Sequence, residues 1–233
     1  MNVALLTAAG RGTRMHNEVP KQFIHIHEKP IILYTMEAFE RHPQIDGILV
    51  VGLPDWEAVL WAYARQLNIQ KFKWFVEGGA TGQASIKNGL LRLKEELSGD
   101  DVVLVHDGNR PMVSQELISA CLSTQRTFGD AVAAIPCVEA VFQSADGLAS
   151  TVSIPRETLY RTQTPHAYPL KKLLWAHEQA EKRGIESTAA SCVLMSKLGE
   201  TVHFCPGSET NLKITTQEDI DIFKALLESQ SHV

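Results

Sequence analysis

A glycine-rich, basic segment follows the first apolar run of the chain, LLTAAGRGTRMHNEVPKQF (residues 5–23). Small residues such as Gly10 and Gly12 leave backbone N–H groups uncovered, so an anion can approach them closely. Arg14 and Lys21 add positive charge; arginine suits bidentate contacts with phosphate oxygens, and lysine acts as a point charge. The segment predicts a polyphosphate site, although a plain glycine turn with solvated cations would also explain the GRG triplet alone.

Two widespread phosphate-binding motifs do not fit this segment. A P-loop needs GxxxxGK followed by Ser or Thr, which the chain lacks here. A dinucleotide fingerprint needs GxGxxG that opens directly into a helix. Met15 stands where the third glycine of that fingerprint should be, and the next segment with helical spacing begins only near residue 30. The sequence therefore predicts a long basic loop of another kind.

The elements that must position this loop follow from the hydrophobic pattern. Short continuous apolar runs alternate with amphipathic segments, which predicts an α/β, Rossmann-like fold with a mostly parallel sheet and helices on both faces. Ligands of such sheets bind at the carboxyl ends of the strands, which confines the site to loops 8–23, 77–85 and 106–113. The expected strands are 3–8, 47–53, 72–77, 101–108 and 130–136, and the expected helices are 30–42, 55–67, 82–97 and 114–128.

The alternation ends at Cys137, where VEAVFQSADGLASTVSI (residues 138–154) has period-two patterning around an Asp146-Gly147 turn. This pattern predicts a protruding β-hairpin arm, about residues 137–163. A two-stranded arm is marginal alone and has unpaired edges, so we expect it to pack on a second copy of the chain as a homodimer. Helices at 169–183, 188–198 and 216–229 and a strand at 201–205 should complete one domain, residues 1–233.

Composition limits the possible partners. The 233 residues include 22 Lys and Arg against 27 Asp and Glu, a net charge of −5, so a surface for nucleic acid is not expected. No apolar run approaches the roughly 20 residues needed to cross a bilayer, and we expect neither a membrane partner nor a secretory signal. The cysteines are widely spaced, which favours buried free thiols and a cytoplasmic location; they are Cys121, Cys137, Cys192 and Cys205.

Five motifs in order give the chain a resemblance to a known family. The chain resembles the polyol-phosphate nucleotidyltransferases, specifically the cytidylyltransferases of the 2-C-methyl-D-erythritol 4-phosphate and D-ribitol 5-phosphate type, over nearly its whole length. That resemblance implies transfer of a cytidylyl group from CTP to a polyol phosphate, with release of pyrophosphate. The motifs are LTAAGRGTRM with PKQF, GGATGQASIKNGL (78–90), VHDGNRP (105–111), IPRETLYRTQTPHAY (154–168) and NLKIT (211–215).

The resemblance also implies roles for residues at the nucleotide. Arg14 and Lys21 would hold the β- and γ-phosphates, and Lys213 would reach the α-phosphate and stabilise charge as the new bond forms. Asp107 would bind Mg²⁺ beside the phosphates, because hard carboxylate oxygens suit that ion, and Asn211 is a weaker candidate for a second ligand. A turn or capping role is the alternative for Asp107. The remaining nucleotide-binding candidates are Ala8, Ala9, Gly10, Gly12 and Gly108.

Cytosine and the acceptor have their own candidate residues. By resemblance, Gly79, Ala80 and Ser85 read the base; a helix N-cap is the alternative for Ser85. Arg156 and Thr164 match residues that grip the acceptor phosphate and, in the family, reach the site from the partner subunit through the arm. In this interpretation the hairpin has a purpose, and the dimer is part of the active site.

Several positions depart from the methylerythritol-phosphate enzymes, and they cluster around the acceptor and the base. Gly82 stands where arginine is usual, GlyAsn (108–109) replaces two small apolar residues, Ala140 replaces a frequent threonine, and STAAS (187–191) lacks the usual acidic residues. These changes favour ribitol 5-phosphate or a related alditol or glycerol phosphate destined for surface polysaccharide. Methylerythritol phosphate for isoprenoid synthesis is the alternative, and a non-catalytic CTP-binding module or a nucleotide-dependent oxidoreductase would be further ones.

Overall fold

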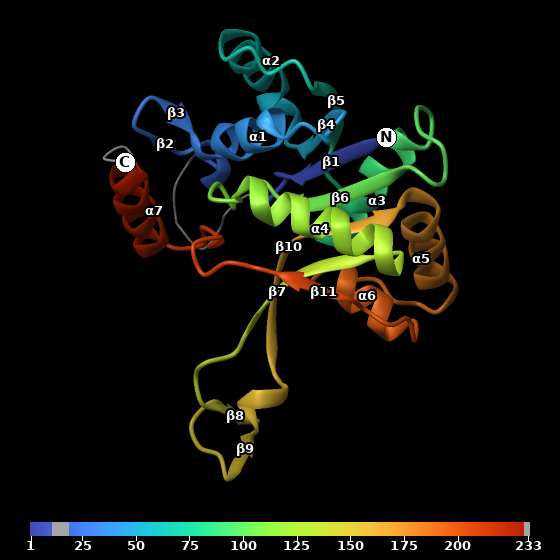
Figure 1. The fold of residues 1–233 in the computed structure, drawn as a ribbon, viewed down its shortest axis with the longest axis vertical. Coiled ribbons are helices and arrows are strands. Elements are labelled where there is room, and N and C mark those ends of the chain that lie inside the picture. Colours follow the sequence, from blue (N-terminus) through green and yellow to red (C-terminus); the bar gives the residue numbers. More distant parts are fainter. Residues whose placement is uncertain (11–18, 231–233) are drawn as a thin grey trace.

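In a computed structural model, residues 1–10 and 19–230 are described. Seven strands of these residues form one sheet in the order β11-β7-β10-β6-β1-β4-β5 (Figure 1). Neighbours pair in parallel, except that β10 runs antiparallel to both β6 and β7. The predicted α/β, Rossmann-like fold is confirmed. The strands are β1 (Asn2–Thr7), β4 (Gly47–Gly52), β5 (Phe72–Glu77), β6 (Val102–Asp107), β7 (Ala131–Pro136), β10 (Tyr160–Pro169) and β11 (Phe204–Pro206).

Helices cover both faces of this sheet because side chains alternate along each buried strand. In β1, Ala4 and Leu6 join the core beneath α1 (Ile31–Arg41), α2 and α4, whereas Val3 and Leu5 join the core beneath α3, α5 and α6. The other helices of these layers are α2 (Glu57–Gln66), α3 (Gly82–Leu93), α4 (Gln115–Phe128), α5 (Leu170–Lys182) and α6 (Ser191–Lys197).

A third, smaller apolar cluster joins the end of the chain to its beginning. Phe223 of α7 (Gln217–Gln230) packs with Ile26 of β2 (His25–Ile26) and Ile31 at the start of α1. The short strand β3 (Lys29–Pro30) pairs with β2, and the 3₁₀ helices η2 (Lys21–Phe23) and η3 (Pro54–Trp56) complete this half of the molecule. Among the described helices, none combines the length and apolar character that a membrane crossing requires.

Some element bounds differ from the sequence predictions for local reasons. Helix α3 ends at Leu93 rather than 97, because residues 94–97 continue as tight turns that still bury Leu97. Helix α6 begins at Ser191 rather than 188, since Ala190 is extended (φ −164°, ψ 162°). Strand β11 begins at Phe204 rather than 201. Strand β10 was not predicted as an element of the sheet.

The segment between β7 and β10 contains a separate two-stranded antiparallel sheet, β8 (Val141–Gln143) with β9 (Val152–Ile154). Figure 1 shows it extending away from the helices and the central sheet. Its turn has Gly147 at φ 72°, and the neighbouring Leu148 is 89% exposed. The short 3₁₀ helix η4 (Arg156–Thr158) follows β9 and precedes β10. That this segment mediates dimerisation stays a prediction.

Candidate active site

A cavity of about 640 Å³ opens at the carboxyl ends of β1, β5 and β6. This is the edge that the loop positions predicted, because parallel strands end there together. Nine of the predicted site residues line it: Ala8, Ala9, Gly10, Lys21, Gly79, Ala80, Ser85, Asp107 and Lys213. Gly12 and Arg14 lie outside the described residues.

One wall of the cavity is the loop after β1, and Gln22 organises it. The backbone N–H of Ala8 donates to the carbonyl of Val51 at 2.7 Å, which extends the sheet by one residue. The side-chain amide of Gln22 then donates to the carbonyls of Ala8 (2.5 Å) and Gly10 (3.1 Å). Lys21 precedes Gln22 in the same 3₁₀ turn, so the loop and this cation have one support.

The facing wall is the turn between β5 and α3. The hydroxyl of Ser85 accepts the N–H of Gly79 at 3.0 Å and donates to the carbonyl of Thr81 at 2.9 Å. The N-cap of α3 is Thr81, whose hydroxyl accepts the N–H of Ala84 at 3.1 Å. The alternative that Ser85 is the N-cap is therefore wrong. A side chain at Gly79 would place its Cβ 2.6 Å from that of Ala84, so the tight turn requires glycine.

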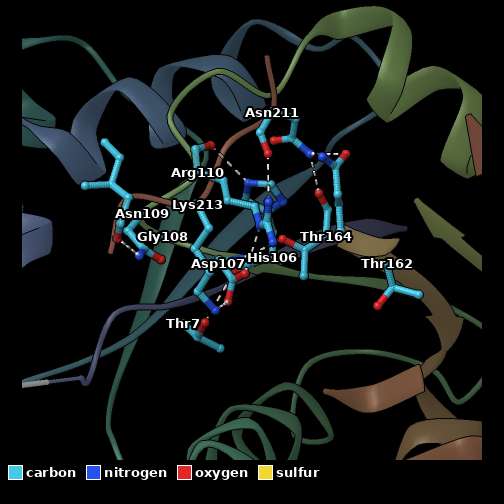
Figure 2. A network of polar contacts seen from close by, with 12 residues as sticks. Thr7, His106, Asp107, Gly108, Asn109, Arg110, Thr162, Thr164, Asn211 and Lys213 are labelled. Atoms are coloured by element: carbon cyan, nitrogen blue, oxygen red, sulfur yellow. Dashed lines mark hydrogen bonds and ion pairs between the residues drawn. The ribbon is translucent and has the colours of Figure 1, made fainter. Parts of the chain in front are cut away.

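The charged centre of the cavity is the carboxylate of Asp107, at the end of β6 (Figure 2). The Lys213 ammonium lies 3.0 Å from one carboxylate oxygen, and the Arg110 guanidinium lies 2.9 Å from the other. Burial alone would raise the pKa of Asp107, but the charges of Lys213 and Arg110 outweigh burial and hold this pKa below its usual range. Asp107 is therefore an ionised carboxylate, and its backbone carbonyl also accepts the N–H of Arg110 at 3.0 Å, so the same residue opens the turn after β6.

Lys213 is held in place through the residues on either side of it. Asn109 donates its side-chain amide to the carbonyl of Ile214, and the N–H of Ile214 donates to the carbonyl of Asn109 at 2.9 Å. Arg110 donates to the carbonyl of Asn211 at 2.7 Å. The loop after β6 therefore clamps residues 211–214 from two directions, and Lys213 projects between the clamped positions toward Asp107 (Figure 2).

Asn211 and Thr164 lie below this centre rather than along the cavity wall. The Asn211 side chain is fully buried and donates to the carbonyl of Thr164 at 2.9 Å. The hydroxyl of Thr164 accepts the N–H of Asp107 from the same chain at 3.0 Å. This corrects the expectation that Thr164 is presented to a partner's site by the arm, because β10 has already re-entered the sheet at that point.

The remaining predicted residues are farther from the cavity. Gly108 supports it from behind: its N–H donates to the carbonyl of Thr7 (2.9 Å) and its carbonyl accepts the hydroxyl of Thr35 (2.9 Å). Arg156 lies in η4 on the protruding segment, where its guanidinium donates to the carbonyl of Val138 at 2.8 Å. Within one chain, Arg156 is not part of the cavity lining.

Two buried histidines lie beneath Asp107 and stay uncharged. Burial lowers the pKa of His106 to about 3 and that of His166 to about 4, and the nearby Asp107 carboxylate offsets this only partly. His106 has one ring nitrogen 3.3 Å from the carbonyl of Arg110. They therefore add no positive charge to the floor of the site near neutral pH.

The structure tests how a divalent cation would fit. Among the described residues, no group of three or more His, Cys, Asp or Glu side chains could hold a metal ion. An ionised carboxylate has about four lone-pair sites, and Lys213 and Arg110 occupy one on each oxygen of Asp107. One carboxylate with free lone pairs fits Mg²⁺, which usually takes one or two carboxylates, waters and substrate phosphates. Asn211 is fully buried and outside the cavity lining, and its amide oxygen has no hydrogen-bond partner among the described residues, so its weaker candidacy as a second ligand stays a prediction.

Sequence reasoning missed several residues of this site. Gln22 and Asn109 both line the cavity, and each uses its amide on backbone carbonyls. Both residues lie inside motifs that the sequence analysis recognised, PKQF and VHDGNRP. The motifs alone did not indicate which contacts these two side chains make. A further wall comes from α3, α5, the segment before α6 and the first residue of α6, with Gln83, His177, Thr188 and Ser191. The Thr188 hydroxyl donates to the side-chain amide oxygen of Gln83 at 3.0 Å.

Comparison with known proteins agrees with this geometry. Residues 2–229 match the family model "IspD: 2-C-methyl-D-erythritol 4-phosphate cytidylyltransferase". The chain belongs to the IspD family. It is 39% identical to a ribitol-5-phosphate cytidylyltransferase of Lacticaseibacillus paracasei, with 97% of this chain and 98% of the relative covered. A ribitol-5-phosphate cytidylyltransferase of Vibrio parahaemolyticus is 38% identical, with 100% and 98% covered.

Relatives that are named for methylerythritol phosphate as the acceptor are also similar in sequence or structure. The 2-C-methyl-D-erythritol 4-phosphate cytidylyltransferase of Clostridium acetobutylicum is 35% identical, with 99% of each chain covered. Among solved IspD-family structures, the 4-diphosphocytidyl-2C-methyl-D-erythritol synthase of Anaerococcus prevotii superposes with a TM-score of 0.81 at 26% identity, covering 97% of this chain and 96% of the other. The predicted resemblance to CTP-dependent nucleotidyltransferases is confirmed.

Proposed function

We propose that this IspD-family enzyme transfers the cytidylyl group of CTP to D-ribitol 5-phosphate, producing CDP-ribitol and pyrophosphate. The observation that supports the chemistry best is the convergence of two glycine-containing walls, Lys21 and the Asp107–Lys213 ion pair on one cavity. The ribitol-5-phosphate enzymes among the relatives reported above, which are somewhat more similar than the methylerythritol-phosphate enzyme, support the acceptor. Ala140 in place of an expected threonine points the same way.

Charge dictates the mechanism that we propose. The acceptor phosphate carries between about one and a half and two negative charges near neutral pH, and it must approach the already anionic triphosphate. One of its oxygens attacks the α-phosphorus, and the bond between that phosphorus and the bridging oxygen breaks as pyrophosphate leaves. No strong base is needed, because the attacking oxygen is already ionised, so orientation and electrostatic stabilisation supply the catalysis.

Each cation has one proposed task in this scheme. Lys21, together with Arg14, holds the β- and γ-phosphates, whose charge increases as pyrophosphate leaves. Lys213 contacts the α-phosphate and stabilises the charge that develops there. The pairing of Lys213 with Asp107 keeps its ammonium group at the cavity floor before substrate arrives, so little reorganisation is required on binding.

Asp107 is the residue that we propose to hold a Mg²⁺ ion, which when bound would neutralise part of the phosphate charge. Its depressed pKa keeps the carboxylate ionised over the working pH range. Asn211, the weaker candidate for a second ligand, also acts as a positioning residue in this proposal, because it links Thr164 to the segment that bears Lys213. Gly12 would extend the backbone surface that Ala8, Ala9 and Gly10 offer to the nucleotide, and Gly108 would support the same surface from behind.

The turn between β5 and α3 is the wall that we assign to the nucleotide base in this proposal. We propose that the backbone of Gly79 and Ala80 and the hydroxyl of Ser85 bind cytosine, with Ser85 fixing the Gly79 peptide as it does already. Limited room beside this turn would exclude purines, and unpaired polar groups would penalise a base with the wrong hydrogen-bonding edge.

Among the described residues of one chain, the cavity lining contains no arginine that could bind the acceptor phosphate. Arg156 is exposed on the protruding segment (57% for its side chain), and it has no place in its own chain's cavity lining. We propose that a homodimer brings Arg156 of each arm to the acceptor end of the other chain's cavity. The exposed apolar side chains of the arm, Phe142 and Val152 among them, support burial against a second copy.

We further propose that residues 1–233 act as a single nucleotidyltransferase domain in the cytoplasm and supply CDP-ribitol for a cell-surface polysaccharide. The cysteines support a reducing compartment: within the described residues all of them are free thiols, and Cys121, Cys192 and Cys205 are buried.

The test is a pyrophosphate-release assay with CTP, Mg²⁺ and a panel of acceptors: D-ribitol 5-phosphate, 2-C-methyl-D-erythritol 4-phosphate and glycerol 3-phosphate. We expect a kcat/KM for ribitol 5-phosphate at least about tenfold above the others, a difference that a few acceptor contacts can supply. A reversed preference would assign the protein to isoprenoid synthesis. CTP binding without pyrophosphate release from any acceptor would indicate a non-catalytic module. Replacing CTP by UTP or ATP is the control for base selection.

A further inference from the structure

The first residues of the loop after β1, Ala8 to Gly10, meet the nucleotide in the proposed function. Beyond Ala8, whose N–H continues the sheet, Ala9 and Gly10 make no backbone–backbone hydrogen bond with another described residue. A loop without such bonds must be held by side chains or be free to move. The only side-chain donor to its carbonyls among the described residues is Gln22.

Gln22 has the geometry of a dedicated support. Its side chain is 2% exposed, and a primary amide has two N–H donors. The amide nitrogen reaches two acceptors, the carbonyl oxygens of Ala8 and Gly10, on either side of Ala9. Two bonds to alternate carbonyls fix the Ala8–Ala9 peptide plane and the peptide plane that follows Gly10.

Fixing these planes determines where the loop presents its donors. The carbonyl and the N–H of a trans peptide point in opposite directions, so holding the Ala8 carbonyl toward Gln22 turns the N–H of Ala9 away from Gln22. That N–H has no acceptor among the described residues, and Ala9 lines the cavity. The described part of the chain therefore leaves this N–H available to an oxygen of a bound ligand.

The other side of Ala9 is also constrained. A Cβ added at Gly78 would lie 2.1 Å from the Cβ of Ala9, so the Ala9 methyl group rests against the bare backbone of the opposite wall. Ala9 is thus held between the Gln22 amide and the turn that we propose to bind the base. A small displacement of Ala9 would change both walls of the nucleotide site.

We propose that Gln22 is a positioning residue that preorganises the loop 8–10 for CTP and couples its shape to the placement of Lys21. Because η2 is a single turn (Lys21–Phe23), the cation and the loop support move together. The inference rests on the proposed function, since it assumes that the cavity binds CTP. It goes beyond that function because Gln22 contacts the loop and not the reacting atoms.

The test measures the Kd of CTP with Mg²⁺ by titration calorimetry in the absence of acceptor. Gln22→Met keeps the length of the side chain and removes both donors; Gln22→Asn keeps the amide but shortens its reach. We expect each variant to bind CTP about tenfold more weakly or worse, because two hydrogen bonds to the loop are lost. The KM for the acceptor, measured at saturating CTP, should change less than twofold, an estimate that treats the two sites as uncoupled.

Gln115→Met is the matched control. Gln115 also donates its amide to a backbone carbonyl, that of Ala38 at 2.8 Å, but lies outside the cavity lining. We expect it to lower the melting temperature without changing the Kd of CTP. If Gln22 had a purely structural role, its variants would also show a lower melting temperature, a smaller fraction of binding-competent protein and an unchanged Kd of CTP. That result would overturn the inference. A parent protein that binds no CTP would overturn the proposed function and this inference together, whereas equal Kd values for parent and Gln22 variants would overturn this inference alone.

Discussion

The ammonium group of Lys213 lies 3.0 Å from the carboxylate of Asp107, across 106 positions of the sequence. The contact joins the carboxyl end of a central strand to a segment just before the last helix, α7. The positive charge of Lys213 helps to keep Asp107 ionised, and the ion pair keeps the ammonium group at the cavity. Several expected outcomes depend on this relationship.

Removing the cation should affect the chemical step. We expect Lys213→Ala to lower kcat by about 10²- to 10³-fold, because charge at the α-phosphate loses its fixed partner. The fold should persist, since the Lys213 side chain is 41% exposed. Steady-state pyrophosphate release and circular dichroism measure both effects. Lys224→Ala, which removes another aspartate-paired lysine, on α7, should behave as the parent protein; a Lys213 variant with parental kcat would exclude the proposed role.

The clamp that holds Lys213 can be weakened without touching the lysine. Asn109→Ala leaves the carbonyl of Ile214 without its side-chain donor, which should lower the free energy of unfolding by about 1–3 kcal/mol. We also expect a fall in kcat smaller than that of Lys213→Ala, because the ammonium group is displaced rather than lost. Urea unfolding and steady-state kinetics are the measurements. Asn88→Ala removes an amide bonded to the carbonyl of Glu77 on the surface and should leave kcat unchanged.

The arm should act on the acceptor and not on the nucleotide. We expect Arg156→Ala to raise the KM for the acceptor about tenfold or more, through loss of a charge-assisted contact with the phosphate, while the KM for CTP stays near the parental value. Arg161→Ala, which removes an exposed arginine paired with Glu209, is the matched control. An equal rise of both KM values would point to general damage instead of acceptor binding.

Mixing two defective proteins tests whether the arms cross between subunits. Arg156→Ala and Lys213→Ala chains that exchange randomly would place both defects in one site of each heterodimer and leave the other site intact. At equal amounts and low acceptor concentration, we expect recovery of about a quarter of the parental activity, as the symmetry of a two-site dimer requires. Activity that stays at the sum of the two variants would contradict an active site shared between chains.

Acid should destabilise the wall beside α5. Burial, helped by the charge of Lys87, lowers the pKa of His177 to about 4, although Glu181 opposes this. The unfolded chain takes up the same proton near pH 6.5, so it binds more protons than the folded state between these values, and stability falls as the pH falls. From about pH 7 to about pH 5 the cost should be about 2 kcal/mol of unfolding free energy.

His177→Gln should remove that part of the pH dependence. Urea unfolding at the two pH values measures it, with His25→Gln, at an exposed histidine bonded to Tyr63, as the control. We expect the difference in unfolding free energy between the two pH values to shrink by about 2 kcal/mol in His177→Gln relative to the control. A difference that stays the same would show that His177 is already charged in the folded protein.

Much of the fold follows from hydrophobic pattern, as the buried strand β4 and its neighbouring helices illustrate. The strand that escaped prediction, β10, shows the limit. Its residues YRTQTPHAYP contain two prolines and few branched apolar side chains, so neither period two nor a continuous apolar run marks it. Its place between β6 and β7 depends on pairing with strands that lie far away in the sequence.

The candidate site divides in a similar way. Glycine positions and charged residues such as Lys21 and Asp107 were recognisable from local motifs, because the chemistry needs those residue types. Gln22 and Asn109 act through backbone carbonyls brought near by folding, and composition alone cannot distinguish such amides from surface glutamines and asparagines. Thr164 shows the opposite error. Its motif was recognised, but the residue was predicted to serve the partner's site, whereas the path of β10 brings its hydroxyl to the N–H of Asp107 in the same chain.

The register of β10 against β6 is set by the pairs from His166 with Val105 to Pro169 with Val102, whereas β8 and β9 form a separate sheet among the described residues. Insertions, deletions or exchanged tips between Gln143 and Val152 would therefore leave the floor beneath Asp107 undisturbed. Under the proposed function, descendants of one ancestor could diversify their choice of polyol by reshaping the outlying segment that carries Arg156, while the machinery for handling the triphosphate is inherited intact.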